Sequence, residues 1–130
     1  MGGPAGPVAA FMAELTAAFQ LLLMLVMGHF LGDFGLQSDR MAREKCPGQG
    51  VTLGWGWWIC SHAAIHGFLV GALSGNGWLG ACEWLLHMLI DHSKCQKRWN
   101  LATDQALHLG CKLIWVLVLS SQGAIPAWIR

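Results

Sequence analysis

Residues 21–33 read LLLMLVMGHFLGD, and this stretch decides the fold class. The run from Leu21 to Met27 is apolar on every side of a helix, whereas a helix of a soluble bundle keeps a polar outer face. His29 and Asp33 follow in the same uninterrupted segment. The stretch therefore predicts a membrane-spanning helix that carries ionisable side chains near one end.

The composition of the whole chain agrees with a membrane protein. Its 130 residues are 55% hydrophobic and only 12% charged, and the mean hydropathy is +0.47. Soluble domains are typically about 25% charged. The net charge is +1, and the basic residues are divided among short loops, which argues against a nucleic-acid-binding face. Because the stretch from Met1 to Ala13 has no Lys or Arg, we do not expect a cleaved signal peptide.

Four apolar segments, each followed by a breaker, predict the helices of the chain. We expect helices over about residues 15–36, 53–73, 78–92 and 104–121. A bilayer core of about 30 Å needs about 20 helical residues, so the first two segments fit well and the last two are short. The predicted fold is all-α, a polytopic membrane bundle of about four transmembrane helices forming a single domain over residues 1–130.

Loop charges predict the orientation of this bundle. Lysines and arginines occupy the first and third connections but not the turn between them, at Ser74 to Gly77; these basic residues are Arg40, Arg43, Lys45, Lys94, Lys97 and Arg98. By the positive-inside rule, both basic loops are cytoplasmic and both termini are outside. Tryptophans near the segment ends suit the membrane interface; they are Trp55, Trp57, Trp58, Trp99 and Trp128.

Glycines at four-residue spacing predict faces where helix backbones approach closely. They are Gly28 and Gly32 in the first segment, and Gly67, Gly71 and Gly75 in the second. A homo-oligomer through these glycine-rich faces is one expectation.

The cysteines do not form a recognisable framework. Cys46 and Cys95 lie in the two basic loops, and no C-x-x-C pair is present. We interpret these two as reduced thiols, in preference to a disulfide or a cysteine-ligated metal.

Each predicted helix carries ionisable groups four residues apart, on one face. The set is His29, Asp33, His62, His66, His87, Asp91, Asp104 and His108. With alternating helix directions, these groups reach a common layer about 10–15 Å thick near the cytoplasmic face. A charged group near the helix centre costs about 2.5–3.5 kcal/mol on membrane insertion, so we expect the set to face inward.

Imidazole and carboxylate groups that converge in a dry bundle predict a divalent metal site, for Zn, Fe or Mn. The alternatives are a proton or ion relay, and hydrogen bonds that only hold helices together. Gln37, Lys94 and Gln105 border the layer and are expected to orient ligands or to bind an anionic group. Glu83 and Lys112, each about 12 Å along its helix from Asp91 or Asp104, are expected to form a buried ion pair.

Several of these motifs occur together in order. They are His29-Phe-Leu-Gly-Asp33-Phe-Gly-Leu-Gln37, Ala42 to Lys45, His62-x-x-x-His66, His87-Met-Leu-Ile-Asp91-His-Ser-Lys94 and Asp104-Gln105-Ala-Leu-His108. In this respect the chain resembles domain-of-unknown-function family 3307 of bacteria and phages, over about residues 22–117. The resemblance implies a small multi-pass protein of a bacterial-type inner membrane. The His and Asp motifs are also similar, more weakly, to inner-membrane proteins described as metal-dependent hydrolases.

The leading hypothesis is a membrane-embedded metalloprotein whose ligands come from the eight His and Asp residues. If the protein is an enzyme, a metal-bound water is the expected nucleophile and Asp33 or Asp91 its general base. The substrate would be a lipid-linked or phosphate-containing molecule reached from the cytoplasmic leaflet. Competing hypotheses are a transporter or proton-relay component, and a non-catalytic membrane assembly subunit.

Overall fold

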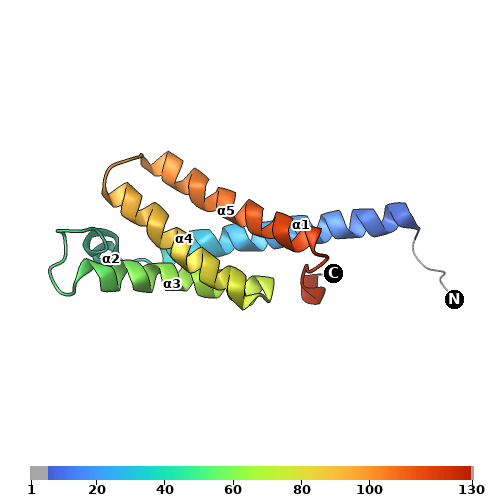
Figure 1. Ribbon diagram of the computed structural model, residues 1–130, viewed down its shortest axis with the longest axis horizontal. Coiled ribbons are helices and arrows are strands. Elements are labelled where there is room, and N and C mark those ends of the chain that lie inside the picture. Colours follow the sequence, from blue (N-terminus) through green and yellow to red (C-terminus); the bar gives the residue numbers. More distant parts are fainter. Residues whose placement is uncertain (1–5, 130) are drawn as a thin grey trace.

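The computed structural model describes residues 6–129, and these are all-α, with no strand among them. In chain order the elements are α1 (Pro7–Phe30), a π-helical turn η1 (Leu31–Gly35), α2 (Asp39–Glu44), α3 (Trp55–Ser74), α4 (Gly77–Cys95), α5 (Leu101–Ser121) and a 3-10 turn η2 (Ala127–Ile129). Figure 1 shows the four long helices running side by side in alternating directions. The single domain expected over residues 1–130 stays a prediction, and residues 1–5 and 130 lie outside the described part.

Capping side chains mark the start of three of the five described α-helices. Ser38, Asn76 and Asn100 accept hydrogen bonds from backbone amides in the first turns of α2, α4 and α5. The predicted segments correspond to the four long helices, with one large difference at the N-terminus. Helix α1 begins at Pro7, well before residue 15, because proline fits the first helical turn and the small apolar residues after it continue the helix. The short helix α2 was not predicted inside the first connection.

Both basic connections lie at one end of the bundle, opposite the turn between α3 and α4 (Figure 1). A disulfide joins Cys46, in the first connection, to Cys95, the last residue of α4, with the two Cα atoms 5.2 Å apart. The prediction of two reduced loop thiols was therefore wrong. The alternating helix directions bring the two loops together, and nothing in a sequence separation of 49 residues signals this proximity.

Helices α3 and α4 pack closely through glycines. A Cβ atom added at Gly67 would lie 2.7 Å from the backbone oxygen of Gly80, and one at Gly80 would lie 3.0 Å from the Cα atom of Gly71. The small residues of α3 thus serve a contact within the chain. Gly75 has a different part, because it ends α3 with a left-handed φ of 66°. Homo-oligomerisation through glycine-rich faces stays a prediction.

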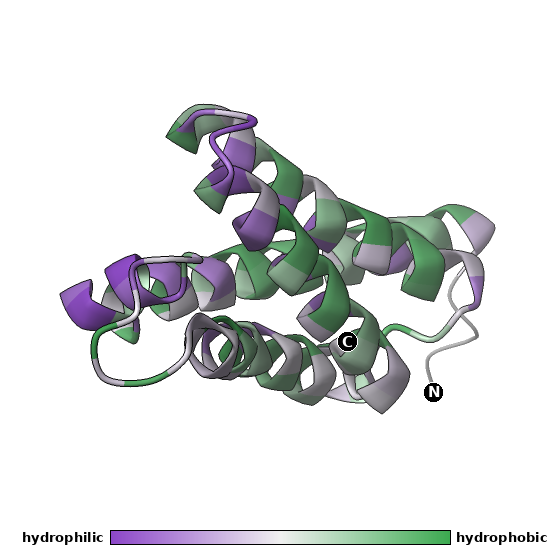
Figure 2. Cartoon of the chain, turned by 60° about the vertical axis from the view of Figure 1, so that its left-hand side comes forward, coloured by the Kyte–Doolittle hydropathy of each residue, from purple (hydrophilic) through white to green (hydrophobic). Residues whose placement is uncertain are grey.

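Apolar and polar interiors occupy different ends of the bundle. The apolar core lies toward the chain termini; it consists of Ala17, Leu21, Leu25, Val70, Leu79, Trp115, Val116, Leu119 and Ile125. The buried His and Asp residues lie toward the basic connections. Figure 2 shows hydrophilic stretches concentrated at that end and apolar residues along the helices. The stretches Pro7–Gly35 and Leu101–Ser121 are long and apolar enough to cross a membrane.

Candidate metal centre

The structure brings all eight predicted His and Asp residues together inside the bundle. Seven of them are at most 2% exposed, and the side chain of Asp33 is 10% exposed. Helix α1 with η1 supplies His29 and Asp33, and α3, α4 and α5 each supply one further pair. The four-residue spacing therefore does place each pair on the inward face of its helix.

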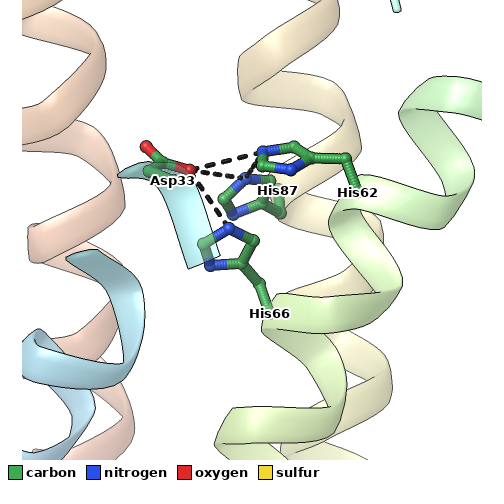
Figure 3. A group of neighbouring side chains, drawn as sticks. All are labelled: Asp33, His62, His66 and His87. Atoms are coloured by element: carbon green, nitrogen blue, oxygen red, sulfur yellow. Dashed lines mark hydrogen bonds and ion pairs between the residues drawn. The ribbon is translucent and has the colours of Figure 1, made fainter. Parts of the chain in front are cut away.

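Asp33 lies at the centre of one group of imidazoles. Its Oδ1 atom is 3.1 Å from His66 Nε2, 3.3 Å from His62 Nε2 and 3.7 Å from His87 Nε2. The Nε2 atoms of His62 and His87 are 3.2 Å apart. Figure 3 shows the three rings turned toward the carboxylate.

These distances fit the edges of a metal-centred tetrahedron. Zinc bonds to nitrogen or oxygen are about 2.0–2.1 Å long, so neighbouring ligand atoms in a tetrahedron lie about 3.3 Å apart. Although they are only 3.1 Å apart, Asp33 Oδ1 and His66 Nε2 do not have the geometry of a hydrogen bond, and neither atom has another hydrogen-bond partner among the described residues. Buried polar atoms without a partner are rare in proteins, and a bound cation would satisfy both. One carboxylate and three imidazoles therefore form a suitable set for a divalent ion.

A π-helical turn positions Asp33. The amide of Leu36 donates to the carbonyl of Leu31 over 2.9 Å, which is a five-residue step. This turn alters the angle between consecutive side chains, as π-bulges commonly do at functional sites. Gln105 Nε2 donates to Asp33 Oδ2 over 2.7 Å, and Gln37 Nε2 donates to the Asp33 carbonyl over 3.0 Å. Both glutamines thus hold Asp33 in place.

His29 lies beside this group. Its Nε2 atom is 3.0 Å from Gln105 Oε1 and 3.5 Å from Asp33 Oδ2. The same glutamine therefore contacts both polar residues at the end of the first helix.

Two lysines neutralise the remaining carboxylates. Lys45 Nζ lies 2.6 Å from Asp91 Oδ2, and Lys94 Nζ lies 2.9 Å from Asp104 Oδ2. Lys94 was expected at the edge of the layer of ionisable groups, and its contact with Asp104 agrees with that position. Lys45 was assigned only to a basic loop, yet its side chain is 8% exposed and inside the cluster. The one signal for it was its place in the run from Ala42 to Lys45 that carries the family resemblance.

Glu83 and Lys112 meet deeper in the bundle. Lys112 Nζ is 2.5 Å from Glu83 Oε1, and both side chains are 1% exposed. Trp115 Nε1 donates to Glu83 Oε2 over 2.7 Å, a contact that spacing alone did not predict. His87 Nδ1 lies 3.4 Å from Glu83 Oε1, so the pair adjoins the imidazole group.

A cavity of about 250 Å³ reaches the cluster from the end with the basic connections. Its lining includes Asp33, Gln37, Lys45, Lys94 and Gln105. The sixth histidine of the chain is elsewhere: His92 stacks on Trp55, with ring centroids 5.3 Å apart. His92 is therefore a natural control residue for experiments on the cluster.

Comparison with known proteins gives a family but no characterised relative. No curated protein and no solved structure matches the chain. The model of one family matches residues 21–129, a region that includes every residue of the cluster. By this match, the chain belongs to the family described as "Protein of unknown function (DUF3307)".

Proposed function

We propose that the protein is a polytopic membrane protein that binds a divalent Zn, Fe or Mn ion through Asp33, His62, His66 and His87. The observation that carries the proposal is the group of four buried ligand atoms, all within 4.8 Å of one another. Their closest separations agree with tetrahedral coordination. Nitrogen ligands from histidine suit these transition metals better than they suit Mg²⁺ or Ca²⁺.

The membrane part of the proposal rests on where the apolar side chains lie. The most apolar windows of the two candidate spans are only 17% and 28% buried, whereas the core helix of a soluble protein is mostly buried. Exposed large apolar residues continue along α3 and α4, for example Phe68, Leu85 and Leu89. Such a surface suits lipid.

Helices α3 and α4 are the second pair of proposed spans. Their 20 and 19 residues give about 30 Å of helix each, enough to cross the hydrocarbon core. The polar residues that lower their hydropathy, such as His66, Glu83 and His87, are buried in the bundle and do not face lipid. All four long helices can therefore span the bilayer with the cluster enclosed.

The cavity beside Asp33 favours a hydrolase over a transporter. It opens at one end of the bundle, while the apolar core with Leu21, Leu25 and Leu119 lies toward the other end. A transporter or proton relay needs a polar path across the bilayer. A one-sided site instead suits metal-dependent hydrolysis of a phosphate-containing or lipid-linked substrate at the leaflet with the basic loops. A non-catalytic assembly role predicts bound metal but no such activity.

General-base roles for Asp33 and Asp91 stay predictions. Asp33 Oδ1 faces the three imidazoles, and Asp91 Oδ2 contacts Lys45. Either carboxylate would act on a water beside the ion only through an oxygen that these contacts leave accessible.

Metal content of the full-length protein, purified in mild detergent, tests the proposal. We expect at least one equivalent of Zn, Fe or Mn by elemental analysis. His66→Ala should lower the content by one equivalent, and His92→Ala should leave it unchanged. Helix content by circular dichroism and elution volume confirm that each variant is folded. Absence of stoichiometric metal in the wild type, or unchanged content in folded His66→Ala, contradicts the proposal.

A further inference from the structure

The three buried carboxylates of the cluster divide their oxygens in the same way. A donor outside the imidazole group holds one oxygen: Gln105 for Asp33, Lys45 for Asp91 and Lys94 for Asp104. The other oxygen, Oδ1 in each case, faces at least one histidine nitrogen. The donor-held Oδ2 atoms of Asp33 and Asp91 also lie 3.5 Å from His29 Nε2 and 3.4 Å from His62 Nε2. Ligating carboxylates in metal sites commonly have this arrangement, because a hydrogen bond to one oxygen orients the other toward the ion.

Asp91 and Asp104 direct their remaining oxygens at one histidine. His108 Nε2 lies 3.5 Å from Asp91 Oδ1 and 3.8 Å from Asp104 Oδ1. Neither His108 Nε2 nor Asp104 Oδ1 has a hydrogen-bond partner among the described residues. His108 is 0% exposed and Asp104 is 1% exposed, so solvent does not satisfy these atoms.

We infer that Asp91, Asp104 and His108 hold a second divalent cation beside the first. Their three ligand atoms lie within 4.8 Å of one another. This inference rests on the proposed function, which supplies the first ion. Three protein ligands leave coordination positions open, whereas the site at Asp33 has a full tetrahedral set. The second ion is therefore the one with room for water or substrate.

The two sites adjoin each other. Asp91 Oδ2 is 3.4 Å from His62 Nε2, a ligand of the first site, while Asp91 Oδ1 faces His108 of the second. The rings of His87 and His108 stack with centroids 4.0 Å apart. The Asp91 carboxylate thus lies between the two candidate sites. The paired ions of two-metal centres are about 3.5–4 Å apart, so a carboxylate in this position would suit such a pair.

A different grouping, His29 with His87 and His108, is less suitable for the second ion. Its ligand atoms are also close together, but it contains no carboxylate. His29 Nε2 is already within 3.0 Å of Gln105 Oε1, so that nitrogen has a partner. The set of Asp91, Asp104 and His108 offers carboxylate oxygens together with an imidazole nitrogen, a mixed donor set that Zn, Fe and Mn accept.

Charge balance indicates what else the centre binds. With neutral imidazoles, the carboxylates of Asp33, Asp91 and Asp104 exceed the ammonium groups of Lys45 and Lys94 by one negative charge. Binding of a first divalent ion changes the net charge of these groups from one negative to one positive, and a second ion makes the net charge still more positive. The second ion should therefore bind more weakly than the first, and an oxyanion should strengthen its binding. The cavity lined by Lys45 and Lys94 gives such an anion access.

Manganese titration of the metal-free full-length protein in detergent tests the second site. We expect two ions per chain, with a spectrum of an isolated ion after the first equivalent and an exchange-coupled pair after the second, by electron paramagnetic resonance. Inorganic phosphate should lower the dissociation constant of the second ion. His108→Ala should keep one uncoupled ion, and His92→Ala should keep the coupled pair.

The outcomes separate the two claims. No bound manganese, together with no Zn or Fe by elemental analysis of the purified protein, contradicts the proposed function itself. Three results overturn only the second site. The first is one bound ion in both the wild type and His108→Ala. The others are two ions without exchange coupling in the wild type, and a coupled pair that persists in His108→Ala. Because the coupling is measured on the wild type, the test holds even if the variant fails to fold.

Discussion

Gly32 lies directly against the imidazole of His66: a Cβ atom added at Gly32 would come 2.5 Å from His66 Cε1 and 2.6 Å from His66 Nε2. The Gly32→Ala variant must therefore displace the His66 ring or the backbone of the π-helical turn, and either shift disturbs the contact between His66 and Asp33. We expect metal affinity to fall about 10–100-fold, as it does when the support of a ligand is lost. Competition titration with a metal-binding dye measures this change.

Gly110→Ala is the matched control, because nothing lies within 4 Å of a Cβ atom at that helical position. Its metal affinity should equal that of the wild type, and its stability should rise by about 0.4–1 kcal/mol. Wild-type affinity in Gly32→Ala would show that His66 is not a ligand or moves without consequence.

The role of Gly32 is a feature that the sequence could not predict. Its spacing from Gly28 indicated a helix contact face, and a Cβ atom added at Gly28 would indeed lie 3.3 Å from Leu73 Cδ1 of α3. The spacing does not tell whether a helix backbone or an imidazole ring packs against a given glycine. That distinction depends on the rotation of α3 against α1, which is a property of the packed bundle.

Lys45 is expected to stabilise the bundle through Asp91. In metal-free protein, Lys45→Met leaves the carboxylate of Asp91 buried, 2% exposed, without its cation. Removing one partner of a buried pair costs about 3–5 kcal/mol. We expect a loss of that order in the free energy of unfolding, measured in detergent with a chelator present.

The exposed Arg98→Met is the control for loop charge and should change the same free energy by less than about 0.5 kcal/mol. Adding Asp91→Asn to Lys45→Met should recover part of the loss, because the unpaired charge is removed. If Lys45→Met alone were as stable as the wild type, that result would contradict a buried ion pair between Lys45 and Asp91.

The cluster and its surroundings differ in how far the sequence predicts them. Pairs such as His62 and His66 follow from four-residue spacing and alternating helices, because both rules act within single elements. The positions of Lys45 and Cys46 depend on α2, a helix of six residues that returns the chain to the bundle. So short an element has little propensity of its own, and tertiary contacts decide it.

Glu83 and Lys112 should show strong energetic coupling. Glu83→Gln and Lys112→Met each leave one charge buried, so each should lose about 3–5 kcal/mol of unfolding free energy. The double variant should lose less than the sum of the two, with a coupling energy of about 0.5–3 kcal/mol. Additive losses would mean that the two groups do not interact. Cys82→Ala, exposed on the same helix as Glu83, should have little effect.

Glu44 gives the first connection a pH-dependent anchor outside the apolar helices. Hydrogen bonds from the Thr52 amide and hydroxyl, with others from the Val51 amide and the Trp58 indole, lower the pKa of its carboxyl from the ordinary 4.5 to about 2. A carboxyl whose pKa is lowered in the folded state stabilises that state above its unfolded pKa. The contribution is lost as the pH falls from about 4.5 toward 2.

The difference in unfolding free energy between the wild type and Glu44→Gln isolates this effect, because the other carboxyls titrate in both. We expect the difference to be constant above about pH 4.5 and to shrink as the pH falls toward 2. A difference that does not vary between pH 6 and pH 2 would show that the hydrogen bonds to Glu44 do not form.

Two features of the basic end bear on the orientation of the bundle in the membrane. Six of the eight Lys and Arg residues lie in its connections or in the last turn of α4, and the positive-inside rule predicts from this bias that the end faces the cytoplasm. The disulfide between Cys46 and Cys95 is also at this end, and disulfides are uncommon in reducing compartments. We expect the charge bias to decide, since it acts during membrane insertion, before the two loops meet.

Thiol labelling measures this orientation directly. In a variant with Ala at Cys60, Cys82 and Cys111, a membrane-impermeant maleimide should modify Cys46 and Cys95 after reduction in inverted vesicles and not in right-side-out vesicles. Labelling in right-side-out vesicles alone would reverse the orientation. It would place the cavity beside Asp33 outside the cytoplasm, because Lys45 and Lys94, which line that cavity, each precede one of the two cysteines in the chain. The same labelling therefore determines from which side of the membrane a substrate would reach the proposed metal site.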